Sequence, residues 1–520
     1  MHPNHWTLSS SSPMALICLL CLFTIPLAVL YLKQLIARTR HHLPPGPRPL
    51  PVVGNLLDIG SDLPHRAFSR LARRHGPVMS VRLGTTPVIV ASSASAAREI
   101  LQSTFPPATG RTRYGANSMF SFQPRHKRRA LRRLGAETLF SARRLDDLLQ
   151  LRRDAVREFL RDVSEHAAAG STPVSVGRAA FAATVTMLWR AMFSAELDGA
   201  LSREIQDGVH EAVVLVSAPN VSDFFPAVAG ADLQGLRRRM ARLIARLYQV
   251  LDRTIEQRVR SRDQGVRTQD LIDGMLDMAQ KEPGDGEATM DRDVMRAFCV
   301  VSQMDPVQPY LPNIVWPNFQ DMLAGASDTT SNTIEWALAE LLKNPQTMRK
   351  LQDELKLVLG SKIMVEDSDI SQLPYPQAVI KETLRLHSVV PLIVCRAETT
   401  IEVQGYSIPK GSYMAVNVWA IHHDADVWSD PDMFIPERFL DRNFDFVGRD
   451  FNFIPFGSGR QICLGLPLAN RMLPILLGSL IHQFEWTLPK GVTRDKISMT
   501  EKFGLVLSMA NPIHAIAKKK

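Results

Sequence analysis

Cysteine is scarce in this sequence, and the few cysteines form no recognisable pattern. Five occur among 520 residues: Cys18, Cys21, Cys299, Cys395 and Cys463. An odd and sparse set argues against a disulfide framework and fits a reducing compartment. Cys18 and Cys21 are three residues apart, but they lie in an apolar run with no second pair, which argues against a zinc site of the finger type.

Internal repeats and long low-complexity linkers are also missing, so we expect one large domain. With 45% hydrophobic and 22% charged residues, the composition is that of a globular chain and not of a disordered one. The formal net charge of +9 suits an acidic protein partner or an acidic membrane surface. Lysine and arginine are scattered without interleaved aromatic residues, so we expect no nucleic-acid partner.

One long run, residues 14–32, has no charged residue at all. Its 19 residues are enough for a helix that crosses a bilayer core of ~30 Å. Lys33, Arg38 and Arg40 follow at once and no lysine or arginine precedes, so the positive-inside rule makes residues 1–13 a lumenal tail and leaves the C-terminal bulk in the cytosol. The alternative is a cleaved signal peptide, but a basic leading region is missing and the run is long for that purpose.

After the predicted transmembrane anchor, residues 33–51 form a basic and proline-rich hinge. Its stretch LPPGPRPLP, residues 43–51, has too many prolines for a helix and predicts a stiff spacer. The remainder, 52–520, is the predicted cytosolic domain.

Within this domain the residue patterns predict mainly helix with a small β region. Alternating β-branched residues around a glycine-containing turn predict a hairpin over 78–92. Residues 131–160 and 231–260 have apolar residues at helical spacing. Residues 262–292 are polar, contain Gly284 and Gly286, and predict an exposed loop with one helical turn inside. Short strands are predicted at 401–403, 406–408 and 413–418.

The most informative stretch is FGSGRQICLG, residues 456–465. Glycines such as Gly457 let a backbone turn tightly and approach a flat ligand. Cys463 can present its sulfur to a metal, while backbone N–H groups and the dipole of a helix that begins near Leu464 favour the thiolate. Arg460 offers a fork of donors to a carboxylate. The alternative is a buried cysteine beside a glycine-rich loop.

Together with three further motifs in order, this stretch resembles the haem loop of the cytochrome P-450 family, F-x-x-G-x-R-x-C-x-G. The residues that match are Phe456, Gly459, Cys463 and Gly465. Gln461 stands at the arginine position and can donate only through an uncharged amide. The resemblance covers nearly the whole chain. It implies the cytochrome P-450 fold, a helix-rich triangular domain with haem b (iron protoporphyrin IX) between two long helices.

The resemblance also implies roles for single residues. Cys463 would be the axial ligand of the haem iron, and the loop residues Phe456, Gly457, Gln461 and Gly465 would contact the haem. Arg396 and Arg132 match family positions that bind the haem propionates. Arg128 occupies the position of the usual tryptophan and could replace its donor. Cys395 is expected to be a packed free thiol.

A second motif, E-x-x-R, is formed by Glu382 and Arg385. Residues three apart share a helix face and can pair, although an exposed pair of this kind is worth little. In the family the pair is buried and joins a later arginine, which Arg438 matches here. The resemblance implies a scaffold behind the haem that does no chemistry itself.

A third motif lies in the stretch AGASDTT, residues 324–330, within an apolar helical region that ends near Lys343. Acid and hydroxyl residues inside a helix compete for backbone hydrogen bonds, and taken alone they could be a polar face. In the family this helix crosses above the iron, and the acid–alcohol pair, here Asp328 and Thr329, supplies protons during oxygen activation. The order Gly325-Ala326 reverses the usual Ala-Gly.

Residues 299–318 have no counterpart in related sequences and contain four prolines but a single charge. Because four prolines cannot lie inside one helix, this insertion must loop out, or the following helix must start near Pro317. It is either a retained intron or faulty gene model, or a loop that contacts the membrane. Our hypothesis is that it weakens or abolishes turnover.

The function implied is that of a monooxygenase of the endoplasmic reticulum membrane, similar to the plant geraniol hydroxylase group. It would insert one atom of O2 into a small hydrophobic substrate, a mono- or diterpenoid, with NADPH electrons supplied through a haemoprotein reductase. One alternative is a haem protein that the insertion has made inactive. Another is a reductase-independent haem-thiolate isomerase or dehydratase, although such enzymes usually lose the acid–alcohol pair. Apolar stretches expected to line the substrate site are 105–122, 221–225, 324–328, 390–394 and 503–507.

Overall fold

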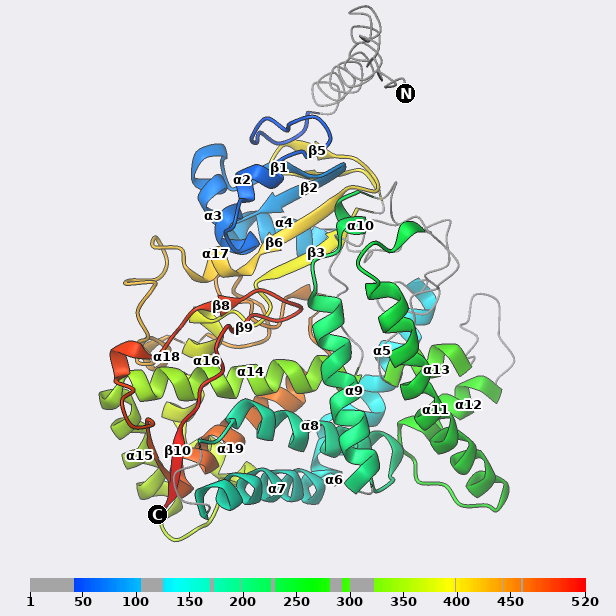
Figure 1. The fold of residues 1–520 in the computed structure, drawn as a ribbon, viewed down its shortest axis with the longest axis vertical. Coiled ribbons are helices and arrows are strands. Elements are labelled where there is room, and N and C mark those ends of the chain that lie inside the picture. Colours follow the sequence, from blue (N-terminus) through cyan, green and yellow to red (C-terminus); the bar gives the residue numbers. More distant parts are fainter. Residues whose placement is uncertain are drawn as a thin grey trace, which may run out of the picture.

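The computed structural model of the protein describes residues 42–103, 125–168, 173–197, 199–225, 230–280, 292–299, 322–397, 399–442, 444–459 and 462–520. Strands β1 to β6 lie at one end of the described structure, next to the N-terminal helices, and long helices make up the other end (Figure 1). The prediction of a mainly helical fold with a small β region is confirmed. Among the described helices, none is long and apolar enough to cross a membrane. The predicted anchor, 14–32, lies outside the described residues.

The helices are α2 (Leu56–Ile59), α3 (Pro64–His75), α4 (Ala94–Ser103), α5 (Arg125–Gly135), the π-helix η2 (Ala136–Phe140), α6 (Ala142–Asp147), α7 (Leu149–Ala168), α8 (Val176–Phe193), α9 (Gly199–Ser217), α10 (Val221–Phe224), α11 (Leu236–Asp263), α12 (Leu271–Gln280), α13 (Arg292–Cys299), α14 (Met322–Lys343), α15 (Pro345–Leu359), η4 (Asp367–Gln372), α16 (Pro374–Leu386), α17 (Val418–His422), α18 (Arg438–Asp441), α19 (Leu466–Gln483) and η6 (Arg494–Lys496). The strands are β1 (Val78–Leu83), β2 (Thr86–Ala91), β3 (Leu392–Arg396), β4 (Ile401–Val403), β5 (Tyr406–Ile408), β6 (Tyr413–Asn417), β7 (Phe484–Thr487), β8 (Glu501–Lys502), β9 (Ser508–Met509) and β10 (Ile516–Lys519).

The largest sheet has four strands in the order β1-β2-β6-β3. Strands β1 and β2 form the predicted hairpin and pair antiparallel, with Val81 opposite Val88. Strand β2 then pairs parallel with β6, and β6 pairs antiparallel with β3, so that Cys395 lies opposite Met414. Short pairs β4–β5, β7–β10 and β8–β9 complete the described strands.

The helical end is built around α14, which runs through the middle of the molecule (Figure 1). It packs against α8 on one side and against α16 and α19 on another. Most of its residues are buried, including Trp336 and Leu338, which are fully enclosed. A helix that is enclosed on all sides is expected to be apolar on all sides. The buried polar residues of α14 therefore require a separate explanation.

The prediction for residues 131–160 is correct in type but wrong in continuity. The helical pattern is divided among α5, the π-helix η2, α6 and α7. Ser141 is the reason for one of the breaks: its backbone is extended, and its hydroxyl accepts a hydrogen bond from the N–H of Arg144 at 3.2 Å, which caps the start of α6. Apolar periodicity survives such a break because each piece still buries the same side.

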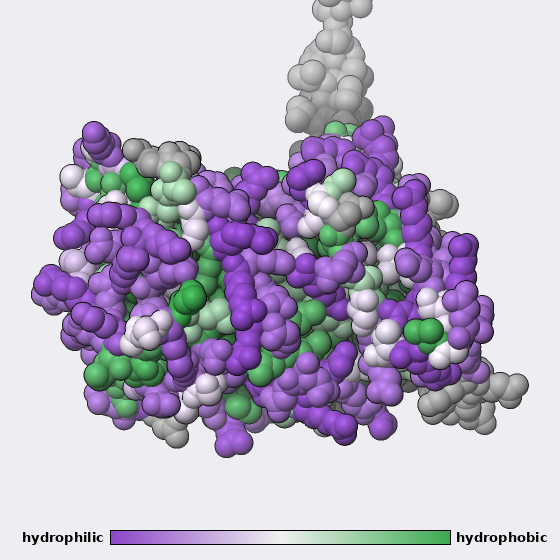
Figure 2. All heavy atoms as spheres, turned by 90° about the horizontal axis from the view of Figure 1, so that it is seen from below, coloured by the Kyte–Doolittle hydropathy of each residue, from purple (hydrophilic) through white to green (hydrophobic). Residues whose placement is uncertain are grey.

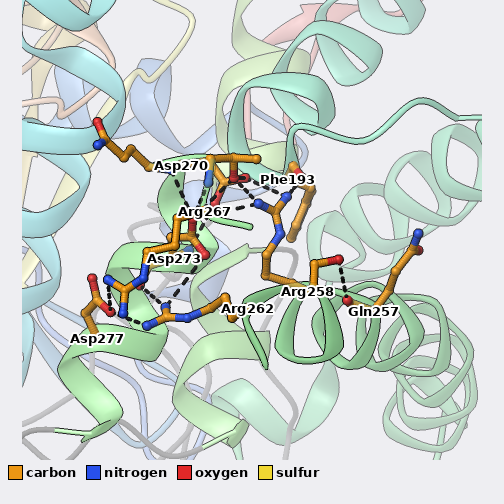
Figure 3. A network of polar contacts seen from close by, with 11 residues as sticks. Phe193, Gln257, Arg258, Arg262, Arg267, Asp270, Asp273 and Asp277 are labelled. Carbon is orange, nitrogen blue, oxygen red and sulfur yellow. Dashed lines mark hydrogen bonds and ion pairs between the residues drawn. The ribbon is translucent and has the colours of Figure 1, made fainter. Parts of the chain in front are cut away.

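The prediction of an exposed loop over 262–292 is wrong for its central part. Residues 271–280 form the helix α12, in which Leu271, Ile272 and Met275 are buried. The polar residues that suggested a loop are partners of arginines on α11 instead (Figure 3). Charge pairing across two helices is not visible as a sequence pattern, because it depends on which helices become neighbours.

The polar network of Figure 3 shows how α12 is attached to α11. Arg258 pairs with Asp270 at 2.8 Å and donates to the carbonyl of Phe193 at the end of α8. Arg262 donates to the carbonyl of Asp273 at 2.9 Å. Both arginines are nearly buried, as are their two aspartate partners. Since buried charges are tolerated only when they are paired, this network joins three helices at defined positions.

Seen from below in the orientation of Figure 1, the helical side of the molecule is largely hydrophilic (Figure 2). Apolar residues reach the surface in areas interrupted by hydrophilic ones, as is usual for a face in contact with water. The hinge residues that the structure describes, 42–51, are not helical, and the carbonyl of Pro45 accepts a hydrogen bond from the N–H of Ser80 in β1 at 2.7 Å.

Candidate functional site

The loop before α19 places Cys463 at the start of a long helix. Its backbone N–H donates to the carbonyl of Phe456 at 2.9 Å, which closes the loop onto itself. Gly459 has a φ of 67°, and a Cβ at this position would lie 2.8 Å from the carbonyl oxygen of Leu101. A side chain is therefore excluded there both by conformation and by space. The glycines of the motif hold the loop against α4, as a close backbone approach requires.

The thiol of Cys463 is exposed on one side and surrounded by protein on the other. Burial raises the pKa of this thiol, while hydrogen bonds from the backbone N–H groups of Gly465 and Leu466 and the positive charge of Arg132 act in the opposite direction. A sulfur that is open to one side and receives N–H donors from a helix start matches the donor set expected of an axial thiolate ligand. The residues present therefore fit a haem iron.

The two arginines predicted to bind propionates come from different elements of the fold. Arg132 in α5 donates to the carbonyl of Ile462 at 2.6 Å, directly before the cysteine. Arg396 ends strand β3, donates to the carbonyl of Gly411 at 3.0 Å and lies over the ring of Tyr413. Both are partly buried cations, which suits carboxylate partners. Their propionate contacts stay a prediction.

Glu382, Arg385 and Arg438 come together in a buried ion network. The side chains of Glu382 and Arg385 are both fully buried and are joined at 2.7 Å and 2.8 Å through two parallel hydrogen bonds. Arg438 donates to the same carboxylate at 3.1 Å. The exposed-pair alternative is thereby excluded for Glu382 and Arg385.

The rest of the network consists of backbone groups that the motif does not reveal. Arg385 donates to the carbonyls of His422, Pro431 and Met433. The Glu382 carboxylate also accepts from the N–H of Ile435 at 2.8 Å. The network thus connects α16 to the segment 422–438, both through ion pairs and through hydrogen bonds to backbone groups.

Asp328 and Thr329 lie in the first half of α14. The Thr329 hydroxyl donates back to the carbonyl of Gly325 at 2.7 Å, as hydroxyl residues inside helices often do. Asp328 is buried and accepts a hydrogen bond from the Asn332 amide at 3.2 Å through one carboxylate oxygen, whereas its other oxygen, Oδ2, is buried without a partner among the described residues. Burial raises the pKa of Asp328 to about 7, so this carboxyl can both hold and release a proton near neutral pH.

One positioning contact behind the cysteine loop has no signal in the sequence. The fully buried His422 accepts a hydrogen bond from the N–H of Ile454 at 3.0 Å through Nε2, and its Nδ1 lies 2.8 Å from the hydroxyl of Ser388. Burial lowers the pKa of His422 well below its usual value, so the ring is neutral and Nδ1–H donates to Ser388. This histidine connects the end of α16 to the loop that carries Cys463.

The turn between β8 and β9 contains 503–507, a stretch predicted to line the substrate site, but its contacts have no signal in the sequence. The N–H of Leu505 donates to the Ser217 hydroxyl at the end of α9 at 2.8 Å. The carbonyl of Leu507 accepts from the Trp336 indole of α14 at 3.0 Å, and its N–H donates to the carbonyl of Val389 at 2.8 Å. This turn thus contacts α14, which carries the predicted stretch 324–328, and Val389, which directly precedes the predicted stretch 390–394.

Several predicted positions lie outside the described residues. These are Gln461, Arg460, the stretch 105–122 and the insertion 299–318 apart from Cys299, which ends α13. Arg128 lies in α5, but its side chain is likewise outside the described part of the chain. Cys395 is buried in β3, as expected for a packed thiol, and burial raises its pKa far above the usual range.

Comparison with known proteins adds a family match over most of the chain. The family model described as "Cytochrome P450" matches residues 44–304 and 316–515. Residues 305–315, which fall between the two matched stretches, lie inside the segment that we identified as an insertion.

Curated relatives cover nearly the full length. Geraniol 8-hydroxylase of Catharanthus roseus is 38% identical over 493 residues, which are 92% of this chain and 95% of the relative. Geraniol 8-hydroxylase of Swertia mussotii is 37% identical, with 92% and 94% covered. Carnosic acid synthase of Rosmarinus officinalis is 36% identical, with 92% and 93% covered.

Proposed function

Since this chain belongs to the cytochrome P450 family of oxygenases, we propose that it is a haem-thiolate monooxygenase that hydroxylates a small hydrophobic substrate, a mono- or diterpenoid. The observation that carries the proposal is the Cys463 thiol, which is exposed on one side and receives N–H donors from the start of α19 on the other. The names of the relatives support the substrate class, because two of them are geraniol hydroxylases.

In this proposal the chain's own residues bind, orient and supply protons. Cys463 would hold the haem, and Arg132 and Arg396 would bind its carboxylates. When bound, the haem supplies the redox chemistry by which O2 is split and one oxygen atom enters a C–H bond. Asp328 holds a proton near neutral pH in a buried position, and Thr329 next to it carries a hydroxyl that can accept and donate.

The partners and the location are part of the same proposal. Electrons would come from NADPH through a membrane-bound haemoprotein reductase with an acidic docking face, which the net charge of +9 would complement. The uncharged run 14–32 would anchor the chain in the endoplasmic reticulum membrane by a single pass and leave the domain in the cytosol.

The direct test uses the full chain co-expressed with an NADPH–haemoprotein reductase in microsomes. Geraniol with NADPH and ¹⁸O2 should give a hydroxylated product that carries one ¹⁸O atom, and omission of NADPH should abolish it. Thr329→Ala should lower product per NADPH oxidised by about 10²-fold or more, because a positioned proton carrier is lost. Product formed without NADPH would favour an isomerase or dehydratase, and a product that draws its oxygen from water would exclude the monooxygenase.

A second candidate function, a haem protein impaired by its insertion, is favoured by the family match that omits 305–315. We expect deletion of 305–315 to raise turnover, because four prolines in 299–318 oppose the continuation of a helix into α14. Cys299 at the end of α13 is fully buried and should be kept in the deleted chain. Equal turnover of the two chains, measured per mole of bound haem, would contradict this expectation.

A further inference from the structure

Helix α14 carries a row of buried polar residues on one face. Asp328, Asn332 and Glu335 are spaced four and three residues apart, so they lie one above another along the helix. All three are buried, in a helix whose other buried residues are mostly apolar. The amide of Asn332 donates to the Asp328 carbonyl at 2.8 Å and to its carboxylate at 3.2 Å. This row, 328–335, is an internal polar path in an otherwise apolar interface.

Glu335 ends the row next to two other parts of the chain. Its Oε1 accepts a hydrogen bond from the N–H of Ile513 at 3.1 Å. On the other side it faces Gly177 near the start of α8, where a Cβ would lie 3.0 Å from Oε2. Neither neighbour is charged, and among the described titratable groups Asp328 is the one whose charge acts on Glu335. Within the described parts of α8 and of the C-terminal segment, no cation neutralises this carboxyl.

Glu335 lies beside a C-terminal segment whose residues on either side of the contact are exposed. Its partner Ile513 is buried, but the flanking residues Pro512 and His514 are exposed. Asp328, by contrast, lies near the start of the described part of α14 and has a buried oxygen without a partner among the described residues. Glu335, beside the segment 511–514, and Asp328, which has a buried oxygen without a partner among the described residues, thus lie on one face of α14.

We propose that Glu335 is the proton supplier of Asp328, a role that rests on the proposed monooxygenase function. After Asp328 has given up its proton, the O–H bond of the Glu335 carboxyl breaks and a new O–H bond forms on the Asp328 carboxylate. Ser331 lies on the same face between them; its hydroxyl, which donates to the backbone carbonyl of Asp328 at 3.0 Å, can accept one proton and donate another. The Glu335 carboxylate is then protonated again by solvent at the edge formed by 511–514. Glu335 acts through Asp328 and does not touch the reacting atoms.

Electrostatics supports this geometry. Burial and, to a smaller extent, the negative charge of Asp328 raise the pKa of Glu335 to about 7, and burial raises the pKa of Asp328 to about 7 as well. Proton transfer between two carboxyl groups of similar pKa changes the free energy little. Because each pKa is higher in the folded protein than in the unfolded chain, the stability that these groups contribute is present at low pH and is lost as the pH rises through about 7.

The test compares Glu335→Gln with a matched control in the full-length holoenzyme. Glutamine keeps an oxygen that can accept from the Ile513 N–H, so the structural contact is retained while the titrating proton is removed. The control is Glu354→Gln in α15, where a carboxylate also accepts a backbone N–H, that of Tyr375 at 2.9 Å, and burial also raises the pKa. Glu354 lies outside the 328–335 row.

Infrared difference spectra against pH give a readout that does not depend on turnover. In the unmodified protein two protonated carboxyls should disappear with midpoints near pH 7. Glu335→Gln should remove one of them, whereas Asp328→Asn should remove the other and move the midpoint of Glu335 to lower pH, because the negative charge that raises its pKa is gone. The loss of stability between pH ~5 and ~8 should also become smaller in Glu335→Gln. A Glu335 midpoint that is unchanged in Asp328→Asn would overturn the proposal.

Turnover supplies the second readout. Glu335→Gln should lower product per NADPH oxidised about tenfold at pH values up to ~7, where Glu335 holds its proton, and Glu354→Gln should leave it unchanged. Equal turnover of both variants across the pH range would refute the inference while leaving the monooxygenase function intact. An inactive unmodified protein would refute the proposed function, and the infrared titration would still decide whether the two carboxyls exchange protons.

Discussion

Replacing Cys463 by alanine should abolish the red-shifted Soret band of the reduced carbon monoxide complex. The reason is that a haem held by a thiolate would give this shift, and the Cys463 sulfur is the thiol that the loop and the start of α19 present on an open side. We expect complete loss of the band, because no other described cysteine is exposed. The measurement is an absorption difference spectrum of reduced membranes with and without carbon monoxide.

Cys395→Ala is the matched control for this experiment. Its thiol lies in strand β3, is buried and has a pKa raised by that burial, so it is a poor thiolate ligand. The control variant should keep the band at full height per mole of protein. A red-shifted band that survives Cys463→Ala, or that disappears in Cys395→Ala, would show that the axial ligand has been assigned to the wrong residue.

The second large effect is expected from Glu382→Ala. This substitution leaves the fully buried Arg385 guanidinium and the nearly buried side chain of Arg438 without their shared counter-charge. Breaking a buried ion pair by removing one partner typically costs about 3–5 kcal/mol, because the remaining charge stays desolvated. We expect a loss of that size in the free energy of unfolding, measured by urea denaturation, together with a lower haem content.

A matched control exists on α7, where Asp154 and Arg157 have the same three-residue spacing as Glu382 and Arg385. Both side chains of this pair are exposed, and they are joined at 2.9 Å. Asp154→Ala should leave the denaturation midpoint nearly unchanged, because an exposed pair of this kind contributes little. Equal effects of the two substitutions would contradict the view that burial, and not the pairing itself, gives the Glu382 network its weight.

Local patterns predicted the type of several elements correctly. The hairpin expected over 78–92 is formed by β1 and β2, and the short strands expected at 401–403 and 406–408 are β4 and β5. The strand expected at 413–418 ends one residue early, because the Asn417 side chain accepts a hydrogen bond from the N–H of Ala420 and caps α17. The helix expected from near Leu464 begins at Leu466. These features depend on neighbours in the chain, which is why the sequence reveals them.

The site could be predicted only as a set of motif positions. The order and spacing of residues singled out Cys463, Glu382 and Asp328, because each belongs to a short motif with a chemical reason for its residue types. The partners could not be found in this way. Three hydrogen bonds each join positions that are far apart in the chain: Ile513 N–H to Glu335, Ile454 N–H to His422, and Leu505 N–H to the Ser217 hydroxyl.

The amino-acid order alone therefore determined the family and predicted the iron ligand and the acid–alcohol pair, since these depend on residues that stand close together in the chain. The tertiary structure decided which of the polar residues are buried and what faces them. It turned the aspartates of 270–277 from a loop into partners of the arginines on α11, and it placed Glu335 in one row with Asp328. The physical reason is that desolvation depends on every segment packed around a group, and this packing exists only once the chain has folded.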